Sequence, residues 1–222
     1  MAGLRSSIAT DPNFWVGHIF VPHDLDLDTF RNALSKQFND AGLNILTDEP
    51  GRVLPAALGR QGRETAPLFI QLAGFADDSE GLEARLFKIK SDLEVEFPIH
   101  FASLSATTVV YKVRGSVETL PRFYPDLSDR DYTTTMILCH ARYSTNTASS
   151  FERVQPFSLL GHNGEINTIN RFRQEAQQIG AVLDPGNSDS QDIDRALETF
   201  CANHDLSLVE AMETIFPPLP YE

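Results

Sequence analysis

The chain has 222 residues, of which 41% are hydrophobic and 22% charged, a balance typical of one folded globular domain and unlike disordered or low-complexity sequences. Its 31 acidic and 18 basic residues give a formal charge of −13, which disfavours nucleic acid binding because phosphate recognition needs clustered Lys and Arg. No apolar run approaches the roughly 20 residues of a membrane span, and the start lacks the apolar core of a signal peptide, so we expect a cytoplasmic protein without membrane contact.

Strand and helix patterns alternate in the first half of the chain. Residues 14–22, FWVGHIFVP, are rich in β-formers and end in proline, which predicts a strand. Apolar residues then recur at three- and four-residue steps over 27–41, which predicts a helix, and Gly42 stands where a left-handed C-terminal cap belongs. A long loop rich in Gly, Pro and Arg is expected at 47–67, then a buried strand at 67–74.

An amphipathic helix is expected next, followed by a mixed second half. The expected elements are the helix at 79–97, antiparallel strands at 99–105 and 107–113, a short helical or turn segment at 120–127, a strand at 133–144, a last strand ending at Leu159–His162, and helices at 166–179, 190–203 and 206–216. This order favours an α+β fold, with helices packed on an antiparallel sheet, in a single domain over 1–222.

The two cysteines, Cys139 and Cys201, are too few for a disulfide framework. Neither stands in a spacing typical of metal ligands, so no metal site is predicted. We expect both to be buried thiols, with Cys139 inside the strand at 133–144.

Polar residues gather in three short clusters, HARYSTNT at 140–147, GHNGEINT at 161–168 and DPGNSDS at 184–190. Each has a purely structural explanation when it is taken alone. The pair Asn163-Gly164 suits a type I′ hairpin turn, Ser188 and Gln191 have the spacing of a helix capping box, and a strand-end Arg142 is most often a surface residue.

Together, the three clusters supply the groups that recognise free glutamine. The guanidinium of Arg142 matches an α-carboxylate with two parallel hydrogen bonds, and the carboxylate of Asp189 accepts from an α-ammonium group. Asn163 and Gly164 offer two donors to the amide carbonyl oxygen as it becomes tetrahedral. The bare backbone of Gly164 permits a close approach of substrate.

The sequence resembles the glutaminase domain of the glutamate synthase large subunit, a class II, or N-terminal nucleophile, glutamine amidotransferase. The segments that carry the likeness are ASLSATTVVYK, FYPDL, HARYSTNT, QPFSLLGHNGEINTI and DPGNSDSQDIDRALE, between about 101 and 217, with a weaker likeness back to about 14. The resemblance implies a four-layer αββα sandwich whose first strands are missing here. It also implies that Arg142 and Asp189 bind substrate, that Asn163 and Gly164 form the oxyanion hole, and that Thr145 and His162 line or support the pocket.

The sequence departs from this family at the nucleophile. The resemblance implies a cysteine at the mature N-terminus whose own α-amino group serves as base, whereas this chain begins Met1-Ala2-Gly3. Two hypotheses follow. In the first, the front of a glutamate synthase-type domain is missing or is supplied by another chain, and the ancestral reaction is glutamine hydrolysis to glutamate and ammonia for transfer to 2-oxoglutarate. In the second, the chain is a noncatalytic subunit that binds glutamine or glutamate or serves in interactions. Both predict that these residues alone are inactive.

The resemblance also implies cofactors and a partner. Glutamate synthases use FMN and an iron–sulfur cluster, but this chain has neither a cluster-type set of cysteines nor a GxGxxG loop. We therefore expect no cofactor in this chain, and FMN and the cluster on a partner glutamate synthase catalytic domain or subunit.

Overall fold

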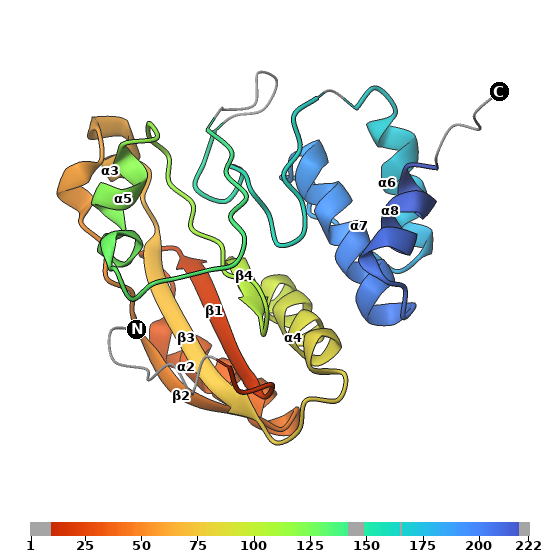
Figure 1. The fold of residues 1–222 in the computed structure, drawn as a ribbon, viewed down its shortest axis with the longest axis horizontal. Helices are drawn as coiled ribbons and strands as arrows, with labels where there is room; N and C mark the ends of the chain where they lie inside the picture. The colour runs from red at the N-terminus through yellow and green to blue at the C-terminus, as the bar shows by residue number, and fades with distance from the viewer. Residues whose placement is uncertain (1–9, 142–148, 165, 218–222) are drawn as a thin grey trace.

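The computed structural model describes residues 10–141, 149–164 and 166–217. Its centre is a four-stranded antiparallel sheet with the order β2-β3-β1-β4 (Figure 1). The strands are β1 (Phe14–Val21), β2 (Leu43–Pro50), β3 (Leu68–Ala76) and β4 (His100–Ser105). The α+β prediction of helices on an antiparallel sheet is confirmed.

Helices surround the sheet, and three of them, α6, α7 and α8, gather on the side of α4 (Figure 1). The α-helices are α2 (Leu27–Asp40), α3 (Arg60–Thr65), α4 (Leu82–Glu96), α5 (Thr119–Phe123), α6 (Ile169–Gln178), α7 (Asp189–Asn203) and α8 (Leu208–Ile215), with 3₁₀ turns η1 (Pro55–Ala57) and η2 (Pro125–Ser128). None of the helices in the described part of the chain has the length and apolar character of a membrane span.

One face of the sheet forms the main core with α2 and α4. Alternate residues of β1, including Trp15 and Ile19, point to this face because successive side chains of a strand point to opposite sides. Phe30, Leu34 and Phe38 of α2 pack there at helical spacing. Gly42 has φ +69°, as predicted for the cap that ends α2.

The other face of the sheet mixes aromatic and polar side chains. Phe20 and Phe69 pack with Tyr124 and Phe151, which come from later segments of the chain. The fully buried His18 lies beside them, with Nδ1 2.9 Å from Val110 O and Nε2 3.2 Å from the side-chain nitrogen of Gln71. Buried polar groups need such partners, so this face is fixed by directional contacts as well as by apolar packing.

The strand predicted at 107–113 is not present. Side chains, rather than a neighbouring strand, take up its backbone groups: Ser103 Oγ accepts from Val110 N at 3.0 Å, and Tyr124 Oη donates to Lys112 O at 2.6 Å. β4 pairs instead with β1. The β-branched residues of this segment predict a strand, but the sequence pattern does not show that side chains will bond its backbone in place of a neighbouring strand.

The strand predicted at 133–144 is also absent over its described residues, 133–141. Met136 and Ile137 are 81% and 74% exposed, and no described residue pairs with this segment in a ladder. The prediction that Cys139 is a buried thiol inside a strand is therefore wrong, because Cys139 is exposed. Cys201 is partly buried on α7.

The loop predicted at 47–67 is largely ordered structure. Its first residues belong to β2, which pairs with β3, and the remainder contains η1 and α3. Gly51 N continues the contact by donating to Phe69 O at 2.7 Å. The polar residues of β2 resemble a loop because this edge strand has one solvated side.

Candidate functional site

The segment 161–164 lies against the N-terminal turn of α7. His162 Nδ1 is 3.3 Å from the hydroxyl of the buried Ser190, the second residue of α7. On its other side, His162 N donates to Gln155 Oε1 at 2.6 Å. These contacts place the Asn163-Gly164 pair next to the start of α7.

A carboxylate of α7 holds the residues before this segment. Asp194 Oδ2 accepts from Ser158 N at 3.2 Å, and its Oδ1 accepts from Leu159 N at 2.8 Å. Leu160 then packs with Ile193 and Leu197. The last strand predicted at Leu159–His162 is therefore wrong, because this segment runs along α7 and takes a side chain in place of a neighbouring strand.

The pair Asn163-Gly164 is not a type I′ turn, since neither residue has a positive φ. Both are exposed, and no hydrogen bond to another described residue engages the Asn163 amide or the Gly164 N–H. A Cβ atom at Gly164 would lie 3.0 Å from His162 Nε2, so the ring of His162 folds over this position. Because both residues are exposed, their donors are accessible to a small molecule.

Asp189 is the first residue of α7 and is half-buried. Its Oδ1 accepts from Ser190 N at 2.9 Å. The predicted capping box at Ser188 and Gln191 is confirmed, with Gln191 N donating to Ser188 Oγ at 3.2 Å and Ser188 N to Gln191 Oε1 at 2.9 Å. Because the box already caps the helix, the second oxygen of Asp189 is not needed for that purpose.

The described residues just before the cluster at 140–147 pass the same segment. A Cβ atom at Gly161 would lie 2.8 Å from Leu138 Cδ2, so the chain leading to Arg142 passes directly beside Gly161. Arg142 and Thr145 themselves lie outside the described residues. The structure thus brings His162, the residue before Asn163, against Ser190, the residue after Asp189, and places Leu138 beside Gly161.

Cys201 stands apart from these groups, at the far end of α7. Cys201 lies 12 residues after Asp189 on α7, about 18 Å along the helix axis. Burial and the nearby Glu198 raise the pKa of its thiol, which lowers the thiolate fraction. Cys139 lies three residues before Arg142 in the exposed segment.

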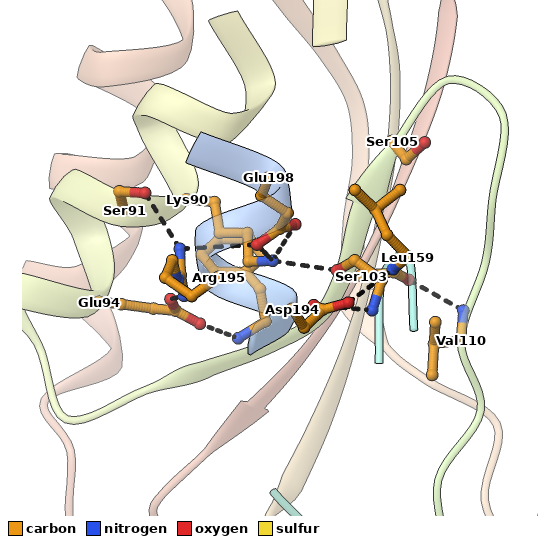
Figure 2. A network of polar contacts seen from close by, with 12 residues as sticks. Lys90, Ser91, Glu94, Ser103, Ser105, Val110, Leu159, Asp194, Arg195 and Glu198 are labelled. Atoms are coloured by element: carbon orange, nitrogen blue, oxygen red, sulfur yellow. Dashed lines mark hydrogen bonds and ion pairs between the residues drawn. The ribbon is translucent and has the colours of Figure 1, made fainter. Parts of the chain in front are cut away.

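A buried ionic network fixes α7 to α4 and β4, and sequence patterns do not reveal it (Figure 2). Lys90 of α4 donates to Glu198 of α7 at 2.6 Å and to Ser158 Oγ at 3.0 Å. Arg195 of α7 pairs with Glu94 of α4. Lys90 and Glu94 are four residues apart on α4, so one face of that helix presents both charges to α7. In the described residues, no group of three or more His, Cys, Asp or Glu side chains is arranged to hold a metal ion.

Comparison with known proteins identifies the family of this chain. The sequence matches the family of class II glutamine amidotransferases over residues 4–222. The chain belongs to this family. The amidotransferase chain is 31% identical to the chloroplastic ferredoxin-dependent glutamate synthase of Oryza sativa subsp. japonica over 233 aligned residues, which cover 92% of this chain and 14% of the rice protein.

Two further relatives extend the comparison. The large chain of the NADPH glutamate synthase of Bacillus subtilis is 31% identical over 84% of this chain and 14% of its own length. The NADH glutamate synthase of Saccharomyces cerevisiae is 31% identical over 72% of this chain and 9% of its own length. The amidotransferase chain is thus a glutamate synthase-like domain that spans only a small part of these curated relatives.

Proposed function

We propose that this amidotransferase domain binds glutamine between segment 161–164 and the start of α7. Arg142 binds the α-carboxylate, Asp189 accepts from the α-ammonium group, and Asn163 and Gly164 donate to the amide oxygen. Thr145 and His162 line the pocket. The observation that supports the proposal is the 3.3 Å contact between His162 Nδ1 and Ser190 Oγ, which joins the residue before Asn163 to the residue after Asp189.

The reaction that this arrangement serves is glutamine hydrolysis to glutamate and ammonia. Attack on the amide carbon moves negative charge to the carbonyl oxygen, where two fixed donors stabilise it. The donors cannot themselves attack, and a class II enzyme uses a thiol with an adjacent base for that step. We therefore propose that a polypeptide of these 222 residues binds glutamine but does not hydrolyse it.

The noncatalytic alternative rests on the positions of the two cysteines. Cys201 is distant along α7, where burial raises the pKa of its thiol, and Cys139 is exposed in the segment 133–141. A protein with this site and no nucleophile would act as a glutamine- or glutamate-binding or interaction subunit. Glutamine turnover when a cysteine-bearing partner is added would favour the enzymatic role over this one.

We further propose that the domain adopts the four-layer αββα sandwich and works with a glutamate synthase catalytic domain or subunit. The extended segment 107–113 lies on the face of the sheet opposite α2 and α4, where a second sheet would pack. FMN and an iron–sulfur cluster would reside on that partner. With two cysteines, this chain does not fit a cluster that takes four thiolates.

Isothermal calorimetry with L-glutamine tests the binding proposal. Arg142→Ala and Asp189→Asn should each weaken binding about 10- to 100-fold, because each removes a charge-assisted hydrogen bond. Arg171→Ala is the matched control, since Arg171 is an exposed arginine that pairs with Glu175 on α6. An absence of heat for the unmodified chain, or equal losses in the control, would remove the proposal.

A further inference from the structure

A cavity of about 290 Å³ lies between α4, β4 and α7, closed on one side by the segment at 182–187. Of the described residues assigned to the glutamine site, His162, Asn163, Gly164 and Asp189, none lines it. Its volume is near the lower end of small-molecule pockets, which hold roughly 300–1,000 Å³. It is therefore a separate space that accommodates one small molecule.

Most charges around this cavity are paired. Lys90 is 2.6 Å from Glu198, and Arg195 pairs with Glu94. Among the described residues, no ion pair reaches the two buried charged groups that remain, Lys112 and Asp194, or the exposed Asp184 at the edge of the cavity. The two buried side chains have opposite signs, are 2% and 5% exposed, and both line the cavity.

Both groups retain hydrogen-bonding capacity. Lys112 Nζ donates to Glu152 O at 3.1 Å, lies 3.3 Å from His100 Nε2 and is 4.5 Å from the centre of the Phe157 ring, so one of its three protons makes no hydrogen bond to a described residue. Asp194 accepts one backbone N–H on each oxygen, from Ser158 and Leu159, which leaves a lone pair on each. An ammonium and a carboxylate thus face one cavity and attract each other across it, and neither makes a direct ion pair with a described residue.

The ionisation of these groups reflects that environment. Burial lowers the pKa of Lys112 to about 7, and burial together with the nearby Glu198 raises the pKa of Asp194 to about 6. Both groups are therefore shifted toward their neutral forms, as expected for buried charges that lack an adjacent counter-ion.

We propose that this cavity binds a small zwitterionic amino acid at a second site. The ligand carboxylate accepts from Lys112 Nζ, and the ligand ammonium donates to Asp194. Ile99, Phe157 and Leu183 supply an apolar wall for its side chain. One zwitterion neutralises both unpaired charges, whereas an isolated anion or cation leaves one of them unpaired.

Binding at this site should be greatest between about pH 6 and pH 7, because Lys112 must be protonated and Asp194 ionised. His100 does not titrate in this range, since burial and the neighbouring Lys112 hold its pKa well below the usual value. The charged and titratable groups around the pair are Lys90 and Glu94 on α4, His100 on β4, Arg195 and Glu198 on α7, Asp184 in the segment 182–187, and Glu152.

The test uses the Arg142→Ala chain, in which the proposed glutamine site is disabled. L-alanine, ethylamine and propionate are titrated by calorimetry and by NMR of the Leu183 methyl groups. L-alanine should bind and shift these methyl signals, whereas each single-charge fragment should bind about 10- to 100-fold more weakly. Lys112→Met and Asp194→Asn should each reduce L-alanine binding by a similar factor. Lys88→Met is the control, since Lys88 is 74% exposed on α4 and does not line the cavity.

L-alanine binding that is absent, or unchanged in Lys112→Met and Asp194→Asn, would overturn the proposal. If those variants fail to fold, the pH profile of the Arg142→Ala chain decides instead. A maximum between about pH 6 and 7 is expected, and a flat profile between pH 5 and 8 would contradict it. Because Arg142 is absent throughout, these results are independent of the glutamine site.

Discussion

The imidazole of His162 lies 3.3 Å from the hydroxyl of Ser190, and this contact joins the Asn163-Gly164 donors to the first turn of α7. Ser190→Ala removes the contact from a buried site, so we expect the unfolding free energy to fall by about 1 kcal/mol. Amide hydrogen exchange at 161–164 should become faster. Ser207→Ala, which uncaps α8, should cost a similar amount without changing exchange at 161–164.

Gly74 on β3 has no room for a side chain. A Cβ atom there would overlap both Asn44 O of the neighbouring strand and the Trp15 indole. We expect Gly74→Ala to lower the unfolding free energy by about 1–3 kcal/mol in urea denaturation, as overpacking does in other cores. At Gly59 a Cβ atom meets nothing within 4 Å, so Gly59→Ala should change stability by less than about 0.5 kcal/mol. Equal effects at the two positions would contradict the close approach at Gly74.

The ion pair between Lys90 and Glu198 joins α4 to α7 in a buried setting, with side chains 3% and 12% exposed. Lys90→Met leaves Glu198 with only the longer, 3.9 Å ion pair to Arg195 among the described residues, which should cost about 3 kcal/mol of unfolding free energy. Lys88→Met removes an exposed pair with Asp92 on the same helix and should cost less than about 1 kcal/mol.

A double variant separates loss of the pair from loss of packing. Lys90→Met combined with Glu198→Leu replaces both charges by apolar groups and should recover most of the stability lost in the single variant. Denaturation midpoints that remain as low in the double variant as in Lys90→Met would show that the unpaired charge is not the cause.

His18 should make the protein less stable in acid. Burial lowers the pKa of His18 from 6.5 to about 4, although its hydrogen bond to Val110 acts in the opposite direction. Between these values the unfolded chain binds a proton that the folded chain does not, so the unfolding free energy falls as the pH falls, by up to about 3 kcal/mol.

Asp194, whose pKa is raised to about 6, adds to the unfolding free energy as the pH falls over part of the same range, in opposition to His18. Because this effect is common to the unmodified protein and to His18→Gln, comparing the two isolates the contribution of His18. The unfolding free energy of the unmodified protein minus that of His18→Gln should decrease as the pH falls from 6.5 to 4. A difference that stays constant would show that His18 is protonated equally in both states.

The parts of the fold that follow local patterns could be predicted from the sequence. The spacing of Phe30, Leu34 and Phe38 gave α2, Gly42 marked its end, and Ser188 with Gln191 gave the start of α7. Each of these signals depends on residues within a few positions of one another, so no knowledge of tertiary partners was needed.

The failures arose where distant side chains decide the backbone conformation. The β-branched residues at 107–113 resemble a strand, but Ser103 and Tyr124 take up their backbone groups. Similarly, Asp194 holds the segment that begins at Leu159. The site clusters were found as sequence motifs, but the contact between His162 and Ser190, 28 positions apart, required the structure.

The central claim is that Asn163, Gly164 and Asp189 contact one glutamine molecule together with Arg142. NMR of the labelled chain during a titration with L-glutamine tests it most directly. The Gly164 amide and the Asn163 side-chain amide should shift in parallel with the Asp189 amide, with one shared dissociation constant, and these shifts should disappear in Arg142→Ala. Shifts confined to one of these positions, or shifts unchanged in Arg142→Ala, would contradict the account.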